Sequence, residues 1–372
     1  MFTYFQGPSA GDKLDKFGGI GPGFDFWRFL LATLIIFLHT FFVCYGRLAE
    51  ISLNVSTGAI ARPIWLAVLP VFFGLSGFLV AGSALRTNSI AVFLTFRVLR
   101  LVPALAVETT LAALILGPLV TTVSLSEYFT HTQFFAYFGN IVGRVRFQLP
   151  GVFENSPEPG IVNLNLWTLH AELECYASMA IAIILGLLRR RMIALSLWIL
   201  ATVCMAIWNA FDGTFEPNKF LYPTSVFTYS FCTGVVAFLW RDKILIHRGL
   251  FGMATAAYCL LVFFPQTVFV AIPLLMYVMI YVGLSPQLNF RMISRGDYSY
   301  GMYLYSFVVQ QSLSIIFPQT RHWWIIFPMS LAITIAISMA SWHYIEKPAL
   351  GLKRLIFRRK INSNVTEIAG AS

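Results

Sequence analysis

The sequence predicts an all-α membrane protein with about ten transmembrane helices. Of its 372 residues, 58% are hydrophobic and only 11% are charged, whereas soluble domains carry about 25% charged residues. Mean hydropathy is +0.74, and apolar stretches close to the roughly 20 residues that cross a bilayer recur along the chain. We therefore expect a polytopic membrane protein with no appended soluble domain.

The predicted spans follow one another with short connections. They lie near residues 24–46, 63–84, 99–120, 166–188, 192–210, 222–240, 249–264, 266–284, 298–317 and 323–345. The seventh and eighth form one apolar run that is broken at Pro265-Gln266, which favours two short helices. The alternative is one kinked helix, which would leave nine spans and put the C-terminus outside.

The distribution of positive charge predicts the orientation. If the N-terminus is cytoplasmic, 20 of the 26 Lys and Arg residues fall on the inner side. The positive-inside rule then favours a cytoplasmic N-terminus and a cytoplasmic C-terminus. We interpret the net charge of +10 as a sign of this topology and of contact with anionic lipid in the bilayer. The basic residues are spread over many loops and form no single face, so no nucleic-acid binding is expected.

This topology divides the chain into three parts. Residues 1–23 are a cytoplasmic N-terminal segment, residues 24–345 the transmembrane domain, and residues 346–372 a basic cytoplasmic tail. The long non-cytoplasmic segment 121–165 has an aromatic first part, which is typical of an interfacial helix, and a turn-rich second part. The first apolar segment is long enough to span and is expected to be an uncleaved anchor.

The five cysteines predict neither a disulfide framework nor a metal site. They all fall in apolar spans and include no CxxC pair, namely Cys44, Cys175, Cys204, Cys232 and Cys259.

Arg28 and His39 are the most informative pair of polar residues in the first span. Eleven residues turn a helix through about 1100°, close to three full turns, so both side chains share one face about 16 Å apart. Ionisable groups inside a bilayer usually mark a pathway or a reaction site.

Two carboxylates are also predicted to lie within spans. Glu172 is about five residues inside the outer end of the fourth span, near the expected depth of His39. Glu108 lies at mid-depth in the third span and is a pathway candidate.

Six motifs together resemble the acyltransferase-3 family, integral membrane enzymes that acylate cell-surface glycans and other extracytoplasmic acceptors. The first is D-x-x-R-x(10)-H, formed by Asp25, Arg28 and His39. The others are VFFGLSGFLV (71–80), FRVLRLVP (96–103), NLWTLHAELECY (165–176), DYSYGMYLY (297–305) and YIEKP (344–348). Within the second, Ser76-Gly77 is typical of a close-packing helix surface. The chain departs from the family at Ser306, where many members carry a histidine.

The resemblance implies a catalytic role for His39 and Glu172. The imidazole would act as a general base or as a nucleophile that accepts the acyl group, and the carboxylate would orient it. The alternative for His39 is a packing residue hydrogen-bonded to a neighbour, and for Glu172 a buried partner of some cation or hydroxyl.

The resemblance also implies an acyl-CoA donor, held by Arg28, Arg97 and Arg100. Arg97 and Arg100 are three residues apart, so they share a face, and guanidinium groups suit the phosphates of coenzyme A. The alternatives are positive-inside placement for this pair and a salt bridge to Asp25 for Arg28.

The resemblance therefore predicts a bacterial inner-membrane O-acyltransferase. It would move an acyl group, acetyl in the first instance, from cytoplasmic acyl-CoA to a sugar hydroxyl of a surface or exported polysaccharide or its lipid-linked precursor. Polysaccharide-assembly proteins are candidate partners, and no metal is expected. One alternative is a lipid-linked saccharide transporter or flippase that uses His39 and Glu172 as a proton relay. Another is a biosynthesis-complex subunit that has lost activity.

Overall fold

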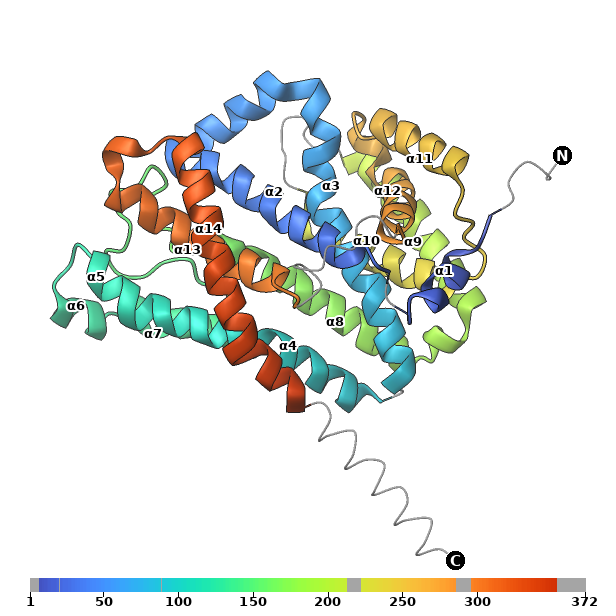
Figure 1. Cartoon of the computed structure of the whole chain (residues 1–372), viewed down its shortest axis with the longest axis horizontal. Helices are drawn as coiled ribbons and strands as arrows, with labels where there is room; N and C mark the ends of the chain where they lie inside the picture. The colour runs from blue at the N-terminus through green and yellow to red at the C-terminus, as the bar shows by residue number, and fades with distance from the viewer. Residues whose placement is uncertain (1–6, 20, 88, 213–221, 286–295, 353–372) are drawn as a thin grey trace, which may run out of the picture.

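The computed structural model of the chain describes residues 7–19, 21–87, 89–212, 222–285 and 296–352, and its regular secondary structure there consists of helices (Figure 1). Within these ranges β structure is limited to two isolated bridges, Ser9 with Leu245 and Thr121 with Val152. This confirms the predicted all-α class. Residues 1–6 and 20 of the predicted N-terminal segment, and residues 353–372 of the predicted tail, lie outside the described part.

The N-terminal segment contains a short helix, α1 (Ala10–Lys16). A capping box starts it: the backbone N–H of Asp12 donates to Ser9 Oγ, and the backbone N–H of Ser9 donates to the Asp12 carboxylate. These bonds hold the pKa of Asp12 below its usual value. The helix docks on the turn after α10 (Thr224–Leu239), where the backbone N–H of Gly11 donates to the carbonyl of Arg241.

Three long helices follow. α2 (Phe24–Tyr45) matches the first predicted span, and α3 (Arg47–Thr87) is much longer than the predicted 63–84. α4 (Ile90–Leu111) continues through a π-helical turn, Ala112–Leu116, into α5 (Gly117–Val120).

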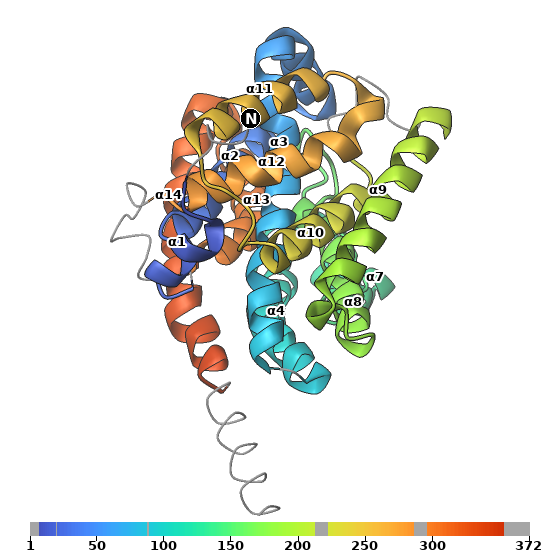
Figure 2. The same ribbon diagram turned by 90° about the vertical axis from the view of Figure 1, so that its right-hand side faces the viewer.

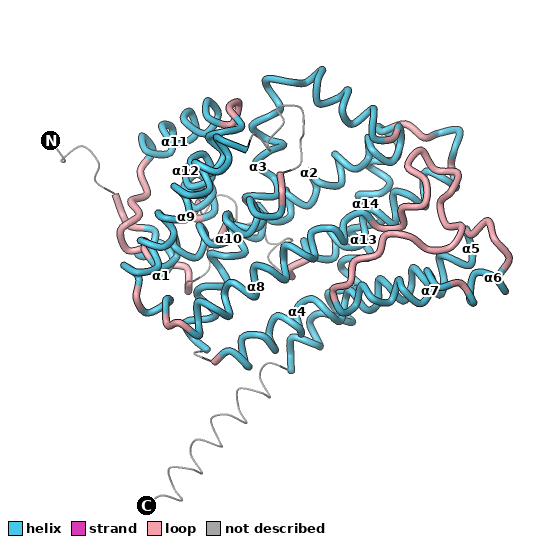
Figure 3. Tube along the Cα trace, turned by 180° about the vertical axis from the view of Figure 1, so that it is seen from behind, coloured by secondary structure: helices cyan, strands magenta, loops and turns pink. Residues whose placement is uncertain are grey.

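The predicted non-cytoplasmic segment folds against one end of the helices (Figure 3). Its aromatic part forms α6 (Leu125–Thr130), α7 (Thr132–Tyr137) and a 3₁₀ turn, Phe138–Val142. Tyr128 and Tyr137 are fully buried in a cluster with residues of the α4–α5 junction and of the following loop. That loop also reaches α13 (Ser299–Ile316), where Gln311 Nε2 donates to the carbonyl of Ile161 at 3.0 Å.

The middle of the chain supplies α8 (Thr168–Ile184), α9 (Arg191–Asp212), α10 (Thr224–Leu239), α11 (Arg248–Leu261) and α12 (Val268–Gly283). The apolar run 249–284 is broken at the 3₁₀ turn Pro265–Thr267, and α11 and α12 are separate helices that pack against each other. α9 lies at the edge of the molecule (Figure 2) and buries little of its surface.

The chain closes with α13 (Ser299–Ile316) and α14 (Trp323–Ser341), and α14 continues through a second π-helical turn, Trp342–Glu346, to Leu352. Six helical segments of the described residues are long and apolar enough to cross a bilayer: Phe24–Tyr45, Ala61–Thr87, Ile90–Val120, Arg191–Phe211, Pro265–Gly283 and Trp323–Leu352. The chain is therefore a multi-pass membrane protein. Ten crossings with both termini inside remain a prediction.

Candidate active site

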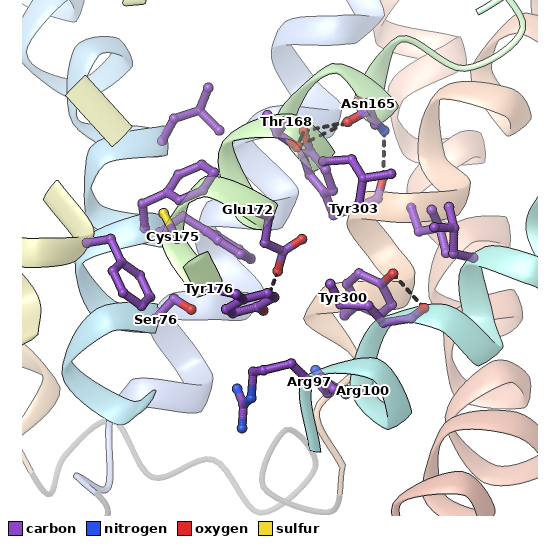
Figure 4. Close-up of a pocket in the computed structure, with 18 of the residues that line it drawn as sticks. Ser76, Arg97, Arg100, Asn165, Thr168, Glu172, Cys175, Tyr176, Tyr300 and Tyr303 are labelled. Carbon is purple, nitrogen blue, oxygen red and sulfur yellow. Dashed lines mark hydrogen bonds between the residues drawn. The ribbon is translucent and has the colours of Figure 1, made fainter. Parts of the chain in front are cut away.

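A narrow cavity of about 80 Å³ lies among α2, α3, α4, α8, α10 and α13 (Figure 4). Four of the five predicted site residues line it: Arg28, Arg97, Arg100 and Glu172. His39 is not among its lining residues. The cavity is mostly apolar, and it carries polar groups at two ends with the carboxylate of Glu172 between them.

Arginines gather at one end, and two of them are paired with carboxylates. Asp297 Oδ2 accepts from Arg28 Nη1 at 2.5 Å and from Arg100 Nη2 at 2.6 Å. Glu346 Oε2 accepts from Arg100 Nη1 at 3.0 Å and is 1% exposed. The alternative for Arg28 was a salt bridge to Asp25, and the structure shows a salt bridge to Asp297.

Asp297 and Glu346 were missed as site residues by sequence reasoning. Asp297 comes just before α13, and Glu346 lies in the π-helical turn after α14. Further bonds hold both carboxylates, from Ser299 Oγ to Asp297 at 2.6 Å and from Ser341 Oγ to Glu346 at 3.0 Å. The only signal for them was that each is the acidic residue of a family-like motif, DYSYG and YIEKP.

Arg97 differs from the other two arginines. Among the described residues it has no carboxylate partner, and its buried Nε has no hydrogen-bond partner. Its guanidinium lies over the rings of Phe93 and Tyr176, at 5.7 and 5.9 Å from their centroids. Arg97 is thus the cation of this cluster that can accept an anionic ligand without first losing an ion pair.

Glu172 lies in the middle of the cavity wall, on α8. Its carboxylate accepts from the hydroxyl of Tyr176 at 2.9 Å, and the positive charges that act on it are those of Arg100, Arg97 and Arg28. The structure shows no contact between Glu172 and His39 within its described ranges. The expected orientation of the imidazole by this carboxylate stays a prediction, and the contact that the structure shows for the carboxylate is the one with Tyr176.

His39 lies three helical turns beyond Arg28 on α2, packed edge-on against the Phe307 ring with 5.5 Å between centroids. Its Nδ1 is buried and has no hydrogen-bond partner among the described residues. The structure therefore separates His39 from the arginines, as the spacing predicted, and leaves one ring nitrogen available to a ligand.

The second end of the cavity consists of neutral polar groups (Figure 4). The hydroxyls of Thr168 and Tyr303 are 2.7 Å apart, and Tyr303 also donates to the backbone carbonyl of Asn165 at 3.0 Å. Ser306, at the position of the family histidine, accepts from Asn165 Nδ2 at 3.1 Å. Ser306 is fully buried and is not a lining residue, so in this chain the position supports Asn165 from behind the cavity wall.

Glu108 is buried behind this neutral end. Its Oε1 accepts from Asn163 Nδ2 at 2.7 Å, and its Oε2 accepts from Thr109 at 3.4 Å. Its hydrogen-bond partners are neutral, so the carboxylate acts here as an anchor for the loop that precedes α8. The described residues contain no group of three or more His, Cys, Asp or Glu side chains that could hold a metal ion.

Known proteins are similar to this chain over most of its length. The chain is 30% identical over 318 residues to Nodulation protein 10 of Rhizobium leguminosarum bv. viciae, covering 78% of this chain and 84% of that protein. It is 26% identical over 294 residues to the O-acetyl transferase of Shigella phage Sf6, covering 74% of this chain and 82% of the relative. No solved structure matches. A family model described as an acyltransferase domain matches residues 22–343, and the chain therefore belongs to the acyltransferase-3 family of membrane acyltransferases.

Proposed function

We propose that this protein is an O-acetyltransferase that takes the acetyl group from cytoplasmic acetyl-CoA. The acceptor is a sugar hydroxyl of a surface or exported polysaccharide or of its lipid-linked precursor, and the enzyme works in the bacterial inner membrane. The similarity to a phage protein named O-acetyl transferase supports the reaction class.

The observation that carries this proposal is the arrangement of charge along the cavity. A cation without a carboxylate partner, Arg97, lies at one end, and neutral hydrogen-bonding groups lie at the other. An acyl-CoA molecule has the same order, with phosphates at one end and a neutral thioester arm at the other. Arg97 would bind the phosphates, and Arg28 and Arg100 would strengthen the local positive potential.

The cavity of about 80 Å³ holds only a few water molecules, so the arm enters as the lining side chains move apart. The helix rise places His39 about 16 Å beyond Arg28. This distance is comparable to a pantetheine arm, so the thioester would reach the imidazole while the nucleotide stays at the cytoplasmic side.

His39 would act on the acceptor hydroxyl. It takes the hydroxyl proton as the oxygen attacks the thioester carbonyl, the new C–O bond forms, the C–S bond breaks, and the proton passes on to the leaving thiolate. In the route through an acyl-imidazole, a ring nitrogen of His39 attacks the thioester carbonyl, the C–S bond breaks, and coenzyme A leaves as the thiol with the imidazole proton. The acceptor hydroxyl then attacks the acyl-imidazole, the C–N bond breaks, and the hydroxyl proton returns to the imidazole. Both routes need the buried ring nitrogen to be available to a reactant.

Purified protein in detergent tests the proposal, because a detergent solution holds no ion gradient. Labelled acetyl-CoA should transfer label to isolated surface glycan, and the His39→Ala variant should lose transfer while its thermal melting stays close to that of the wild type. His170→Ala is the matched control, since this histidine of α8 lies outside the cavity lining. Retained transfer in His39→Ala would remove His39 from the mechanism, and absence of transfer by the wild type would contradict the proposed activity.

A further inference from the structure

We propose that the side-chain carbonyl of Asn165 binds an amide N–H of the donor's pantetheine arm. This inference rests on the proposed use of acyl-CoA and assigns a recognition residue to the neutral end of the cavity. Neither the family match nor the relatives assign this residue a role.

The first observation is an unpaired acceptor. Asn165 lines the cavity and is 1% exposed, and its Oδ1 has no hydrogen-bond partner among the described residues. Buried side-chain polar atoms are nearly always hydrogen-bonded, so such an atom in a cavity wall points to a ligand that supplies the donor.

The contacts of the side-chain nitrogen of Asn165 fix the orientation of its amide group. Asn165 Nδ2 lies within hydrogen-bond distance of the backbone carbonyl of Tyr303 and of Ser306 Oγ. A carbonyl oxygen can only accept, so the nitrogen must face Tyr303 and the oxygen must be the unpaired atom.

The surrounding framework holds Asn165 rigidly in place. Asn163 Oδ1 accepts from the Asn165 backbone N–H at 3.1 Å, while Asn163 Nδ2 donates to Glu108 at 2.7 Å and to the carbonyl of Leu304 at 2.9 Å. The hydroxyls of Thr168 and Tyr303 both lie within hydrogen-bond distance of the backbone carbonyl of Asn165, at 3.1 and 3.0 Å. These bonds hold Asn165 in position and leave its Oδ1 free to accept from a ligand, as a preorganised binding site requires.

The chemistry of the site selects the kind of ligand. A carbonyl oxygen repels phosphate and carboxylate groups and accepts from an N–H or O–H. The pantetheine arm carries two secondary amides between its phosphates and its sulfur. A donor held at Arg97 would therefore bring an amide past Asn165 before the thioester reaches His39.

An acetyl-CoA analogue tests the assignment. Replacing the amide nearest the sulfur by an ester removes the N–H and preserves the length of the arm. The wild-type kcat/KM should fall about tenfold with this analogue, as expected for the loss of one buried hydrogen bond. An analogue with the same change at the other amide shows which of the two N–H groups is bound.

Variants then place the lost bond at Asn165. In Asn165→Ala the amide and ester donors should give the same kcat/KM. In Asn209→Ala the tenfold difference should persist, because Asn209 also has a buried unpaired Oδ1 but lies on α9, outside the cavity lining. A persistent tenfold difference in Asn165→Ala would overturn the assignment.

The comparison of acetyl-CoA with its ester analogues uses the wild-type protein, so it does not depend on whether any variant folds. Transfer from acetyl-CoA with no loss for either ester analogue would overturn this inference and leave the proposed function intact. Absence of transfer from acetyl-CoA itself would contradict the proposed function. A loss in Asn165→Ala that affects both donors equally and raises only the KM for the glycan would assign Asn165 to the acceptor hydroxyls instead, and would also overturn the inference.

Discussion

At the scale of single residues, the three arginines at the cavity have different surroundings and should have different roles. Arg28 and Arg100 share Asp297, and Arg100 also pairs with Glu346. Arg97 has aromatic rings beside it and no carboxylate. An incoming phosphate gains a full charge interaction from Arg97, whereas it must compete with existing ion pairs at the other two.

We therefore expect Arg97→Ala to weaken acetyl-CoA binding by about tenfold to a hundredfold, the range for a charge-assisted hydrogen bond. Equilibrium binding of labelled acetyl-CoA measures this loss of affinity. Arg97→Lys keeps the charge and should recover part of the affinity. Unchanged affinity in Arg97→Ala would exclude this residue as a phosphate ligand.

The main effect of Arg100→Ala should be a lower stability of the folded protein. The substitution leaves the buried carboxylate of Glu346 without its cation, and breaking a buried pair costs about 3–5 kcal/mol. Thermal melting in detergent should show a markedly lower midpoint than for Arg97→Ala. If both variants melt like the wild type, the ion pairs of Arg100 do not stabilise the helix ends.

Glu172→Gln separates two roles for this carboxylate. The amide still accepts from Tyr176, but the negative charge among the arginines is gone, so the KM for acetyl-CoA should fall while kcat changes little. If Glu172 instead orients His39 during catalysis, kcat should drop by about a hundredfold or more. Steady-state kinetics distinguish these results.

At the scale of elements, α3 and α10 cross with their backbones almost in contact. A Cβ atom on Gly77 would collide with the carbonyl oxygen of Phe231, and one on Gly234 would collide with that of Gly74. The close-packing surface predicted from Ser76-Gly77 is thus present, and it brings Ser76 and Phe231 into the cavity wall.

Gly77→Ala should therefore destabilise the protein by about 1–3 kcal/mol, the cost of overpacking, and lower activity with it. Gly252→Ala is the control, because nothing lies within 4 Å of a Cβ at that position of α11. Melting curves of the two variants measure the difference. Equal midpoints would show that the α3–α10 crossing can widen at no cost.

The apolar stretches of the sequence predicted where the helices lie, but they did not predict the π-helical turns. The π-helical turns Ala112–Leu116 and Trp342–Glu346 each precede a proline by two residues, at Pro118 and Pro348. Proline lacks an N–H and clashes with the carbonyl four residues before it, so the backbone widens there. Both prolines were visible in the sequence, yet only the structure shows that the second turn carries Glu346 to Arg100. The length of α3 was also underestimated, because a hydropathy window stops where the apolar run stops and the helix does not.

At the scale of the molecule, the cavity depends on contacts that hydropathy and spacing could not predict. Arg28 and Asp297 are 269 residues apart in sequence, and Arg100 and Glu346 are 246 apart. Spacing predicted that Arg28 and His39 share a helix face, because that relation lies within one helix. Depth alone placed Glu172 near His39, and it could not predict the hydrogen bond from Tyr176, since depth in a membrane does not fix which way a side chain points.

The predicted topology makes one further test of the whole molecule possible. If the chain crosses the bilayer ten times, the segment 121–165 lies on the extracytoplasmic side. The α10–α11 connection and the end of α14 then lie on the cytoplasmic side. Exposed positions for single added cysteines exist in each, namely Ser126, Lys243 and Gly351. The parent chain, whose own cysteines fall in apolar helices, gives the background.

A membrane-impermeant maleimide should label Ser126→Cys in intact spheroplasts, and should label Lys243→Cys and Gly351→Cys only after the membrane is permeabilised. The inverted pattern at all three positions would reverse the orientation. Labelling of Gly351→Cys in intact cells together with Ser126→Cys would mean that α11 and α12 together make a single crossing, leaving nine spans. In that case Glu346 and Arg100 could not meet at the cytoplasmic end, because the end of α14 would lie on the opposite side of the bilayer.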